Sequence, residues 1–362
     1  MNILIFNWRD IKNSWAGGSE IYIHEIAKRL VKKGHSVTLF CGQDPEIKLP
    51  EEEIIDEINV IRKGSRFSLY LWAPIYYFKK LRKGTDIIID CENGLPFFTP
   101  LFSSKKKICV VHHVHGKQFF YELPKPLAIF GYILERYLFP MAYKFTKIIA
   151  VSNTTKKELI KIGFNKDRIK IVYNGLNQNK NSHGMRKFSR PTIIYLGRIK
   201  KYKRVGLLVN LMSEILSKVP NARLLIAGWG TEGGVIADSV MSGKNKNNVS
   251  IMGSVSEREK ENLLERSWVF VNPSIHEGWG ISVMEASFHG LPSVAFNVPG
   301  LSESIVNKKT GFLVKSNQEM IEKLVFLLKN KKVRDELGES AKLWAGKFNW
   351  NKSSSEFMKN LS

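Results

Sequence analysis

The sequence predicts an α/β protein made of two doubly wound domains, each with a parallel β-sheet covered by helices. Short apolar runs rich in β-branched residues alternate with amphipathic helical stretches, as in successive βα units. Runs of this kind are typical of strands buried on both faces of a parallel sheet. The length of 362 residues also exceeds what one ordinary hydrophobic core accommodates.

The apolar runs are the expected strands. In the first half they lie at 3–6, 36–40, 86–90, 107–112, 147–152 and 168–174. In the second half they lie at 192–197, 222–228, 249–253, 268–273 and 292–297. The polar segment between the two groups, rich in Gly, Asn and Ser, is typical of a linker and covers 174–191. We therefore expect the first domain to end near residue 175.

The chain is strongly basic, with 56 Lys and Arg against 33 Asp and Glu and a formal net charge of +23. The excess is shared almost equally between residues 1–175 and the remainder, so it does not form a tail. Such a charge suits a polyanionic partner or an anionic surface, or it serves solubility alone. The hydrophobic fraction of 43% is typical of a soluble globular protein.

Cysteine usage and the apolar segments indicate a cytoplasmic protein. Cys41, Cys91 and Cys109 have neither paired nor metal-binding spacing, and we expect buried free thiols in a reducing compartment. The N-terminus lacks the basic start of a secretory signal and meets charge within ten residues. The stretch 123–143 is the best candidate for a membrane span, but prolines and charges interrupt it.

The sequence WAGGSE places Gly17 and Gly18 between the first strand with its loop and a long amphipathic helix that ends at Gly34. We expect the helix to begin near Ser19, a good N-cap. Glycines here let backbone N–H groups approach an anion at the positive helix terminus, beyond the carboxyl end of a strand. The alternative is a flexible turn before a capped helix, because this is neither a G-x-G-x-x-G nor a Walker motif.

The sequence LGRIKKYKR sets Arg198 and Lys203 in the loop after an expected strand. Cations at the carboxyl end of a strand are well placed to bind a diphosphate. In so basic a protein, a solvated basic loop is the alternative.

The sequence HEGWGISVMEAS combines two carboxylates, Glu277 and Glu285, with two glycines that open a helix, Gly278 and Gly280. This combination at one strand end suits a nucleotide-sugar. The amides can face phosphate, and a carboxylate can accept hydrogen bonds from sugar or ribose hydroxyls. The alternatives are a surface carboxylate at Glu277 and a capping box in which Ser282 is the N-cap and Glu285 the third helical residue.

Three histidines, His112, His113 and His115, follow another expected strand. They suggest a metal at first sight, but no further ligand set is apparent nearby, and adjacent side chains on a strand diverge. A polar histidine at the edge of a cleft is the favoured interpretation. The DCE triplet at 90–92 mimics a D-x-D metal motif, and we expect it to be a strand terminus. We therefore predict no metal site.

In combination these motifs resemble the retaining GT-B glycosyltransferases of family four, over nearly the whole chain. WAGGSEIYIHEIAKRLVKKGHSVTLF resembles the N-terminal signature, and AVSNTTKKEL and IVYNGLN resemble the end of the first domain. YLGRIKKYKRV, LLIAGWG and NPSIHEGWGISVMEASFHGLPSVAFNVPGLSE resemble the C-terminal signature. The resemblance implies two Rossmann-like domains facing a cleft. It assigns 1–175 to acceptor binding, 176–345 to nucleotide-sugar binding, and 346–362 to a helix that packs back towards the N-terminal domain.

The resemblance also implies roles for the C-terminal motifs. Arg198 and Lys203 would hold the donor diphosphate and stabilise the leaving group. Glu277 would contact the donor hexose, and Glu285 would bind the ribose hydroxyls. The segment 251–255 would lie near the base. The backbone of one loop would approach the donor sugar and phosphate: Gly278, Trp279, Gly280, Ile281 and Ser282.

In the N-terminal half, the resemblance places Gly17 and Gly18 near the donor diphosphate and the acceptor. His112 best matches the histidine that family members hold beside the donor sugar. A typical member has a single histidine, often followed by Asp, so His113 and His115 remain alternatives. The catalytic residues that the resemblance implies are therefore His112, Arg198, Lys203 and Glu277.

The function implied by the resemblance is transfer of a hexose from a GDP- or UDP-hexose to a glycan or lipid-linked acceptor, with retention of configuration and no metal or other cofactor. The base, hexose, linkage and acceptor are not given by the sequence. The alternatives are a nucleotide-sugar epimerase or phosphorylase on a related fold, and a basic nucleic-acid-binding protein. No zinc-finger, RRM or KH signature supports the last of these.

Two segments of the first half also predict peripheral attachment to an anionic membrane surface. Segment 69–83 combines aromatic and apolar residues with a basic cluster, and segment 117–145 is rich in large apolar residues. Aromatic side chains beside Lys and Arg are typical of interfacial segments. The alternative is that these apolar faces belong to the core of the first domain.

Overall fold

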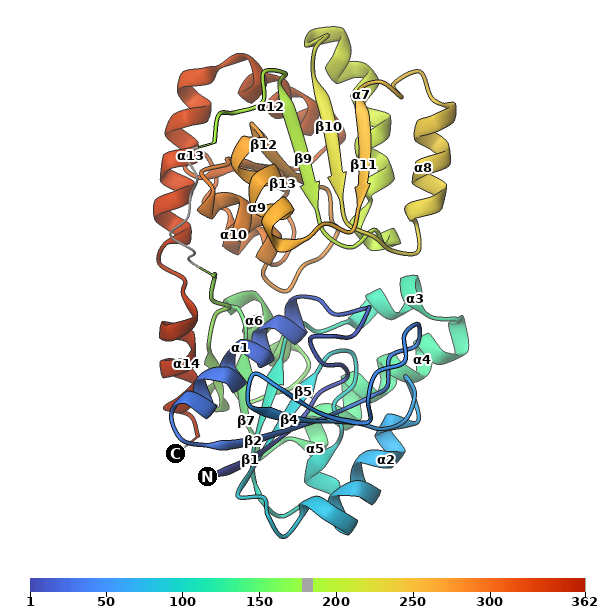
Figure 1. Ribbon diagram of the computed structural model, residues 1–362, viewed down its shortest axis with the longest axis vertical. Helices are drawn as coiled ribbons and strands as arrows, with labels where there is room; N and C mark the ends of the chain where they lie inside the picture. Colours follow the sequence, from blue (N-terminus) through green and yellow to red (C-terminus); the bar gives the residue numbers. More distant parts are fainter. Residues whose placement is uncertain (178–184, 362) are drawn as a thin grey trace. The chain divides into compact units, whose positions relative to one another are not determined.

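The computed structural model describes residues 1–177 and 185–361. The chain forms two compact α/β units, each with its own sheet between helices (Figure 1). The first unit contains Met1–Gly175 and Asn349–Ser362, and the second contains Leu176–Phe348. Part of the predicted linker, residues 178–184, lies outside the described residues. The predicted doubly wound fold class is confirmed.

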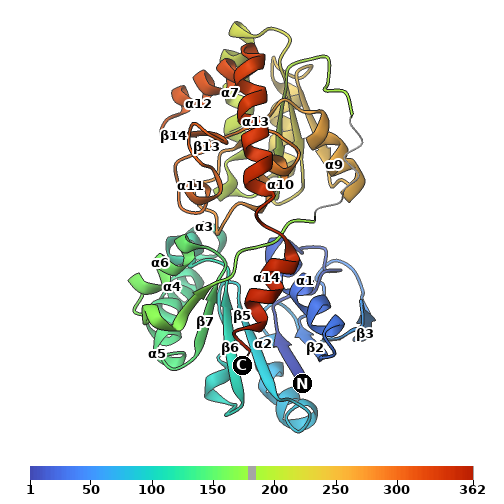
Figure 2. The same ribbon diagram turned by 90° about the vertical axis from the view of Figure 1, so that its left-hand side faces the viewer.

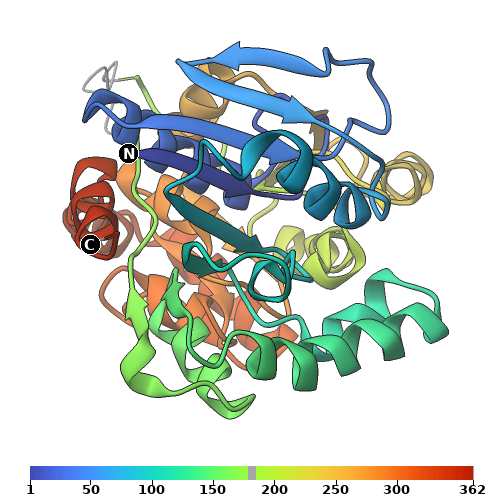
Figure 3. The same ribbon diagram turned by 90° about the horizontal axis from the view of Figure 1, so that it is seen from below.

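The first unit is built on an eight-stranded sheet in the order β3-β4-β2-β1-β5-β6-β7-β8. All neighbours are parallel except the pair β3 and β4, which is antiparallel and lies at one edge (light blue in Figure 3). The chain winds outwards in both directions from β1. The strands are β1 (Asn2–Phe6), β2 (Ser36–Cys41), β3 (Glu52–Ile55), β4 (Ile58–Arg62), β5 (Ile87–Glu92), β6 (Lys106–Val111), β7 (Lys147–Ala150) and β8 (Ile169–Ile171).

Helices cover both faces of this sheet. On the sequence they are α1 (Gly18–Lys32), α2 (Leu69–Tyr76), α3 (Phe119–Glu122), α4 (Lys125–Ile133), α5 (Phe139–Ala142), α6 (Asn153–Lys161) and α14 (Trp350–Met358). The π-helical turns η1 (Tyr77–Leu81) and η4 (Leu134–Leu138) continue α2 and α4. Three short 3₁₀ turns are η2 (Thr99–Leu101), η3 (Gly116–Gln118) and η5 (Lys166–Arg168).

The C-terminal helix α14 belongs to the first unit, where it lies beside α1 (Figure 2). Trp350, Phe357 and Leu361 are buried in the same core cluster as Tyr22 of α1. The Tyr22 and Trp350 rings meet edge to face at 6.0 Å. The last segment of the chain thus completes the core of the unit that contains the N-terminus.

The second unit has a six-stranded parallel sheet in the order β11-β10-β9-β12-β13-β14. The strands are β9 (Thr192–Leu196), β10 (Arg223–Ala227), β11 (Val249–Gly253), β12 (Val269–Asn272), β13 (Ser293–Phe296) and β14 (Gly311–Val314). The helices are η6 (Lys201–Lys203), α7 (Val205–Lys218), α8 (Gly233–Ser242), α9 (Glu257–Arg266), α10 (Ile281–Phe288), α11 (Leu301–Ser304), α12 (Asn317–Lys329) and α13 (Lys331–Ala345).

The continuous apolar runs arise because both faces of the sheets are buried. In β9, Ile193 and Tyr195 belong to one core cluster, while Ile194 and Leu196 belong to the cluster on the other face. The β1 strand of the first unit alternates between two clusters in the same way. The three cysteines are free and buried, as predicted.

Three strands were not predicted. The hairpin of β3 and β4 turns at Asp56 and Glu57, which have φ values of 49° and 63°. Such turns normally contain glycine or asparagine, so this sequence lacks the usual hairpin signal. The β3 strand is also partly exposed, and β14 is only four residues long. The β3 and β14 strands lie at sheet edges, where the apolar signal is weaker because one neighbour is solvent, whereas β4 lies between β3 and β2.

Candidate active site

In the second unit, the loops that follow β9 and β12 join through an ion pair. The Lys203 ammonium donates to Oε1 of Glu277 at 2.5 Å, and both side chains are largely buried. The backbone N–H of Ile275 also donates to the carbonyl of Tyr202 at 3.1 Å. The sequence assigned Lys203 to phosphate and Glu277 to sugar. The structure adds that these two predicted site residues are direct partners, 74 positions apart in the chain.

Both members of this pair are held in their charged forms. Burial would raise the pKa of Glu277, but the Lys203 charge and hydrogen bonds from Lys203, Asn272 and Ser274 outweigh it and lower the pKa below its ordinary value. Burial likewise opposes the charge on Lys203, but the neighbouring Glu277 raises the pKa of Lys203. The site therefore presents a buried carboxylate and a buried ammonium at fixed positions.

The helix α10 begins at the same strand end. Its N-cap is Gly280, whose φ of 81° lies in the left-handed region that favours glycine. A Cβ there would also lie 3.0 Å from Leu301. The capping-box interpretation was wrong, because Ser282 is the second residue of the helix and not its N-cap. The N-cap thus has no side chain to cover the positive end of this helix.

The Trp279 side chain is buried, and its ring meets the Phe348 ring edge to face at 5.1 Å. It therefore serves as packing within the second unit. Trp279 could contact a ligand through its backbone, which is the role that the resemblance implies for the whole segment 278–282.

Glu285 lies one turn into α10 and pairs with Lys260 of the preceding helix α9. The Lys260 ammonium donates to Glu285 at 2.7 Å and also meets Glu257 at 2.7 Å. Burial opposes the charge on Lys260, but Glu285 and Glu257 raise its pKa. This cation was not predicted, because α9 looks like an ordinary charged surface helix in the sequence. Lys260 fixes one oxygen of Glu285 and thereby orients its carboxylate.

The backbone around Arg198 is fixed by the neighbouring strand. The Tyr195 hydroxyl donates to the carbonyl of Arg198 at 2.9 Å, and the N–H of Ile199 donates to Trp229 at 2.7 Å. The loops are packed so closely that a Cβ on Gly228, with φ of 139°, would lie 1.9 Å from the carbonyl oxygen of Gly197. The loop that carries Arg198 is therefore anchored at the carboxyl end of the parallel sheet.

In the first unit, the double glycine opens α1 as expected, although the helix begins at Gly18 and its N-cap is Gly17 rather than Ser19. Gly17 has φ of −154°, an extended conformation open to any residue. Its N–H donates to Oε2 of Glu20 at 2.8 Å. The buried Glu20 carboxylate also accepts from Arg9, at 3.2 Å. The backbone conformation of Gly17 therefore does not itself demand glycine.

His112 follows β6 directly and is buried. Its ring meets the Tyr22 ring edge to face at 5.3 Å, and its Nε2 atom accepts no hydrogen bond and donates none among the described residues. Burial lowers the pKa of His112 to about 4, so the ring is neutral near pH 7. Its backbone carbonyl accepts from Thr155 at 3.0 Å. His112 is thus a fixed, neutral imidazole with one nitrogen unused within the described chain.

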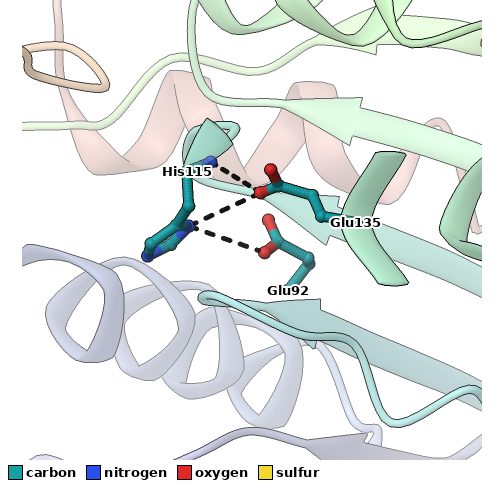
Figure 4. Close-up of side chains that lie close together, drawn as sticks. All are labelled: Glu92, His115 and Glu135. Atoms are coloured by element: carbon teal, nitrogen blue, oxygen red, sulfur yellow. Dashed lines mark hydrogen bonds and ion pairs between the residues drawn. The ribbon is translucent and has the colours of Figure 1, made fainter. Parts of the chain in front are cut away.

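The other two histidines lie in the loop after His112. The His113 and His115 rings stack with centroids 4.1 Å apart. The Nδ1 atom of His115 lies 3.9 Å from Glu92 and 3.7 Å from Glu135 (Figure 4). Within the described residues, this trio is the group of side chains with the geometry to hold a metal ion. The expectation that no ligand set lies near the histidines was wrong, because Glu135 approaches from a segment 20 positions further along.

The DCE triplet forms the end of β5, as expected. Asp90 accepts hydrogen bonds from Phe97, Thr99 and Tyr143, so its carboxylate is part of the core. Burial, and then the nearby Glu135 charge, raise the pKa of Glu92 well above its ordinary value. The two carboxylates of the triplet thus have different environments.

Family models match most of the chain in two consecutive parts. The model for glycosyltransferase family 4 matches residues 16–180, and the model for glycosyl transferases group 1 matches residues 178–344. The chain belongs to glycosyltransferase family four. This family-four enzyme thus carries both signatures to which the sequence motifs were assigned, and its two α/β units are the Rossmann-like domains of the GT-B fold.

The following proteins are similar to the enzyme at low sequence identity. An uncharacterized glycosyltransferase of Methanocaldococcus jannaschii is 27% identical over 348 residues, which cover 87% of this chain and 85% of that protein. The trehalose synthase of Thermococcus litoralis is 31% identical over 161 residues, only 42% of this chain and 39% of that protein. HepE of Anabaena, solved with UDP and glucose, has a TM-score of 0.78 at 15% identity and covers 100% of this chain and 99% of its own.

The comparisons support a glycosyltransferase, and nothing in them favours an epimerase, a phosphorylase or a nucleic-acid-binding protein. None of the helices in the described part of the chain has both the length and the apolar character that a membrane crossing requires.

Proposed function

We propose that this family-four enzyme transfers a hexose from a UDP- or GDP-hexose, and that the second unit binds this donor. The observation that carries the proposal is the Lys203–Glu277 ion pair beside the glycine-capped start of α10. A cation, a carboxylate and a helix N-terminus at one sheet edge match the diphosphate and the hydroxyls of a nucleotide-sugar. The likeness to HepE, solved with UDP and glucose, agrees with this donor class.

The proposed chemistry depends on charge that develops on the leaving diphosphate when the glycosyl bond breaks. Arg198, Lys203 and the α10 N-terminus would stabilise that charge without rearrangement, because their loops are anchored to strands. Glu277 would then serve two purposes: it orients Lys203, and its carboxylate accepts hydrogen bonds from the hexose hydroxyls. The transfer itself would need no metal and no other cofactor.

Glu285 is the proposed ribose-binding group. Lys260 holds one oxygen of its carboxylate at 2.7 Å, so that the second oxygen has a defined direction. A carboxylate fixed in this way can accept from the ribose hydroxyls and disfavours ligands that lack them. Lys260 acts here as a positioning residue.

In the first unit, His112 is the histidine we assign to the donor sugar. It is neutral, fixed by Tyr22, and its Nε2 can still donate or accept a hydrogen bond. A neutral imidazole can bind a hydroxyl without adding charge at the reacting carbon. We propose retention of configuration by front-face attack, in which the departing phosphate rather than a protein side chain takes the acceptor proton. Gly17 and Gly18 would leave room for the acceptor and the diphosphate.

We further propose that the acceptor is a glycan or a lipid-linked glycan, and that the first unit attaches to an anionic membrane surface. The α2–η1 face, defined as residues 67–83, has a buried side and an exposed side. Its exposed large residues are Phe67, Leu71, Trp72, Ile75 and Phe78. The core explanation therefore accounts for only part of this segment.

Basic side chains accompany this exposed side. The exposed cations are Lys79, Lys80, Arg82 and Lys83. Exposed aromatic and apolar side chains next to cations suit the interface of an anionic leaflet, where each cation contributes about 1 kcal/mol. The helical stretch 119–145 adds further exposed apolar side chains: Phe120, Tyr121, Leu127, Ile129, Phe130, Ile133, Tyr137, Met141 and Phe145.

A donor screen tests the proposed function. Calorimetry with UDP- and GDP-sugars should identify one tight donor, followed by turnover with lipid-linked and soluble glycan acceptors. Analysis of the product by NMR would report the anomeric configuration. Binding of neither nucleotide class would reject the donor site, and an inverted product would reject the proposed mechanism.

A further inference from the structure

The cluster of Glu92, His115 and Glu135 is not used by the proposed transfer, although all three side chains are largely buried. They come from three different parts of the first unit: the end of β5, the loop after β6, and the turn η4. Figure 4 shows the three side chains converging on one point. Two carboxylates and one imidazole thus lie close together in a buried position.

The Glu92 carboxylate has more acceptor capacity than the described residues satisfy. Glu135 accepts the backbone N–H groups of His115 and Gly116, both at 2.6 Å. Glu92 accepts one N–H, from Gly94 at 2.8 Å, through Oε1. Its other oxygen, Oε2, is buried and has no hydrogen-bond partner among the described residues. A buried carboxylate oxygen without a partner is costly, which points to a further ligand at this place.

We propose that Glu92, His115 and Glu135 bind a divalent cation of the first transition row, with Zn²⁺ or Mn²⁺ as the best fit. The ligand atoms all lie within 4.8 Å of one another, and His115 Nδ1 is 3.7 and 3.9 Å from the two carboxylates. An ion about 2.0–2.2 Å from each ligand spans separations up to about 4.2 Å. The two distances from Nδ1 already fall within that span.

The chemistry of the ligand set selects the ion. Imidazole suits zinc and other transition metals, whereas carboxylates also suit manganese. Magnesium prefers an all-oxygen octahedron and retains several waters, so one imidazole and two carboxylates disfavour it. Two carboxylates would also neutralise the double charge of the ion in a buried place.

The ion would position a loop and would not take part in sugar transfer. It would connect the segment that follows His112 to β5 and η4, and it would give the Glu92 carboxylate a further partner. Glu135 already fixes the backbone of this loop through two hydrogen bonds, so the ion would add the His115 side chain to an existing connection.

Metal binding by the full-length protein tests the proposal. Protein stripped with a chelator and then freed of it should bind one equivalent of Zn²⁺ or Mn²⁺ by calorimetry, and elemental analysis after dialysis should confirm the ratio. Glu92→Gln and His115→Gln should each weaken this binding by at least the 10–100-fold that loss of even an outer-shell partner produces. His24→Gln is the matched control, because His24 contacts Asp56 at 2.8 Å elsewhere in the same unit.

Several results would overturn the proposal. One is the absence of stoichiometric binding of either ion, which would leave the two carboxylates to share a proton. Another is undiminished affinity in both Glu92→Gln and His115→Gln. If a variant fails to fold, X-ray absorption of the zinc-loaded natural protein decides. One imidazole with oxygen ligands supports the site, and two or more imidazoles or any sulfur ligand exclude it.

Discussion

Replacing Lys203 by methionine should separate the structural from the functional contribution of its ion pair. The two side chains are 13% and 12% exposed, so Lys203→Met leaves a charged Glu277 in a buried position. Loss of one member of a buried pair typically costs 3–5 kcal/mol of folding free energy. Because Glu277 keeps its hydrogen bonds from Asn272 and Ser274, we expect the lower end, about 3 kcal/mol.

The same substitution should weaken donor binding. A hydrogen bond to a charged group is worth about 1.5–3 kcal/mol, which corresponds to a loss of about 10- to 150-fold in affinity. The double variant Lys203→Met with Glu277→Gln removes both charges. It should regain most of the stability, since neutral replacements of buried pairs are often tolerated, but it should not regain donor affinity.

Urea unfolding of the full chain and calorimetry with the preferred nucleotide-sugar supply the two measurements. The reasoning fails if the single variant is as stable as the natural protein, because the pair would then not be buried in solution. It also fails if the double variant binds donor normally, because Lys203 would then have no contact with the diphosphate.

Three further predictions use other parts of the structure. Burial holds the pKa of His112 at about 4 against an ordinary 6.5, so between these pH values the unfolded chain binds a proton that the native state does not bind. The free energy of unfolding should therefore fall by about 3 kcal/mol as the pH drops from about 6.5 to about 4. The variant His112→Gln should flatten this part of the pH–stability curve. Arg198→Ala and Glu285→Ala should each weaken nucleotide-sugar binding by about 1.5–3 kcal/mol in calorimetry, and unchanged affinity in both would reject the assigned donor site. Co-sedimentation with anionic liposomes should be salt-sensitive and should decrease when four cations are replaced by Gln: Lys79, Lys80, Arg82 and Lys83. Equal binding to neutral liposomes would contradict the electrostatic attachment.

The sequence contained most of the fold because its signals are local. Buried parallel strands require continuous apolar runs. The runs predicted at 3–6 and 192–197 correspond to β1 (Asn2–Phe6) and β9 (Thr192–Leu196), with alternate residues on two core faces. Edge strands lack this requirement, and the β3–β4 hairpin turns at Asp56 and Glu57 without a glycine. The strands of this hairpin are recognised from their pairing in the sheet and not from a pattern in their own residues.

The sequence predicted the motifs of the candidate site, but it did not predict which of the charged side chains pair with one another. The glycine-capped helix and the carboxylates of HEGWGISVMEAS are visible in the sequence because each lies within one short segment. The pairing of Lys203 with Glu277, and of Lys260 with Glu285, joins residues 74 and 25 positions apart. No local pattern encodes such distances, because they are set by the order of strands in the sheet.

By itself, then, the sequence determined the two α/β units, the motifs at their strand ends and the family to which the enzyme belongs. Only the tertiary structure decided which charges meet: Lys203 with Glu277, Lys260 with Glu285, and His115 with the two carboxylates of β5 and η4. The physical reason is that periodicity and turn chemistry act over a few residues, whereas burial and ion pairing depend on segments that the sheet brings together from far along the chain.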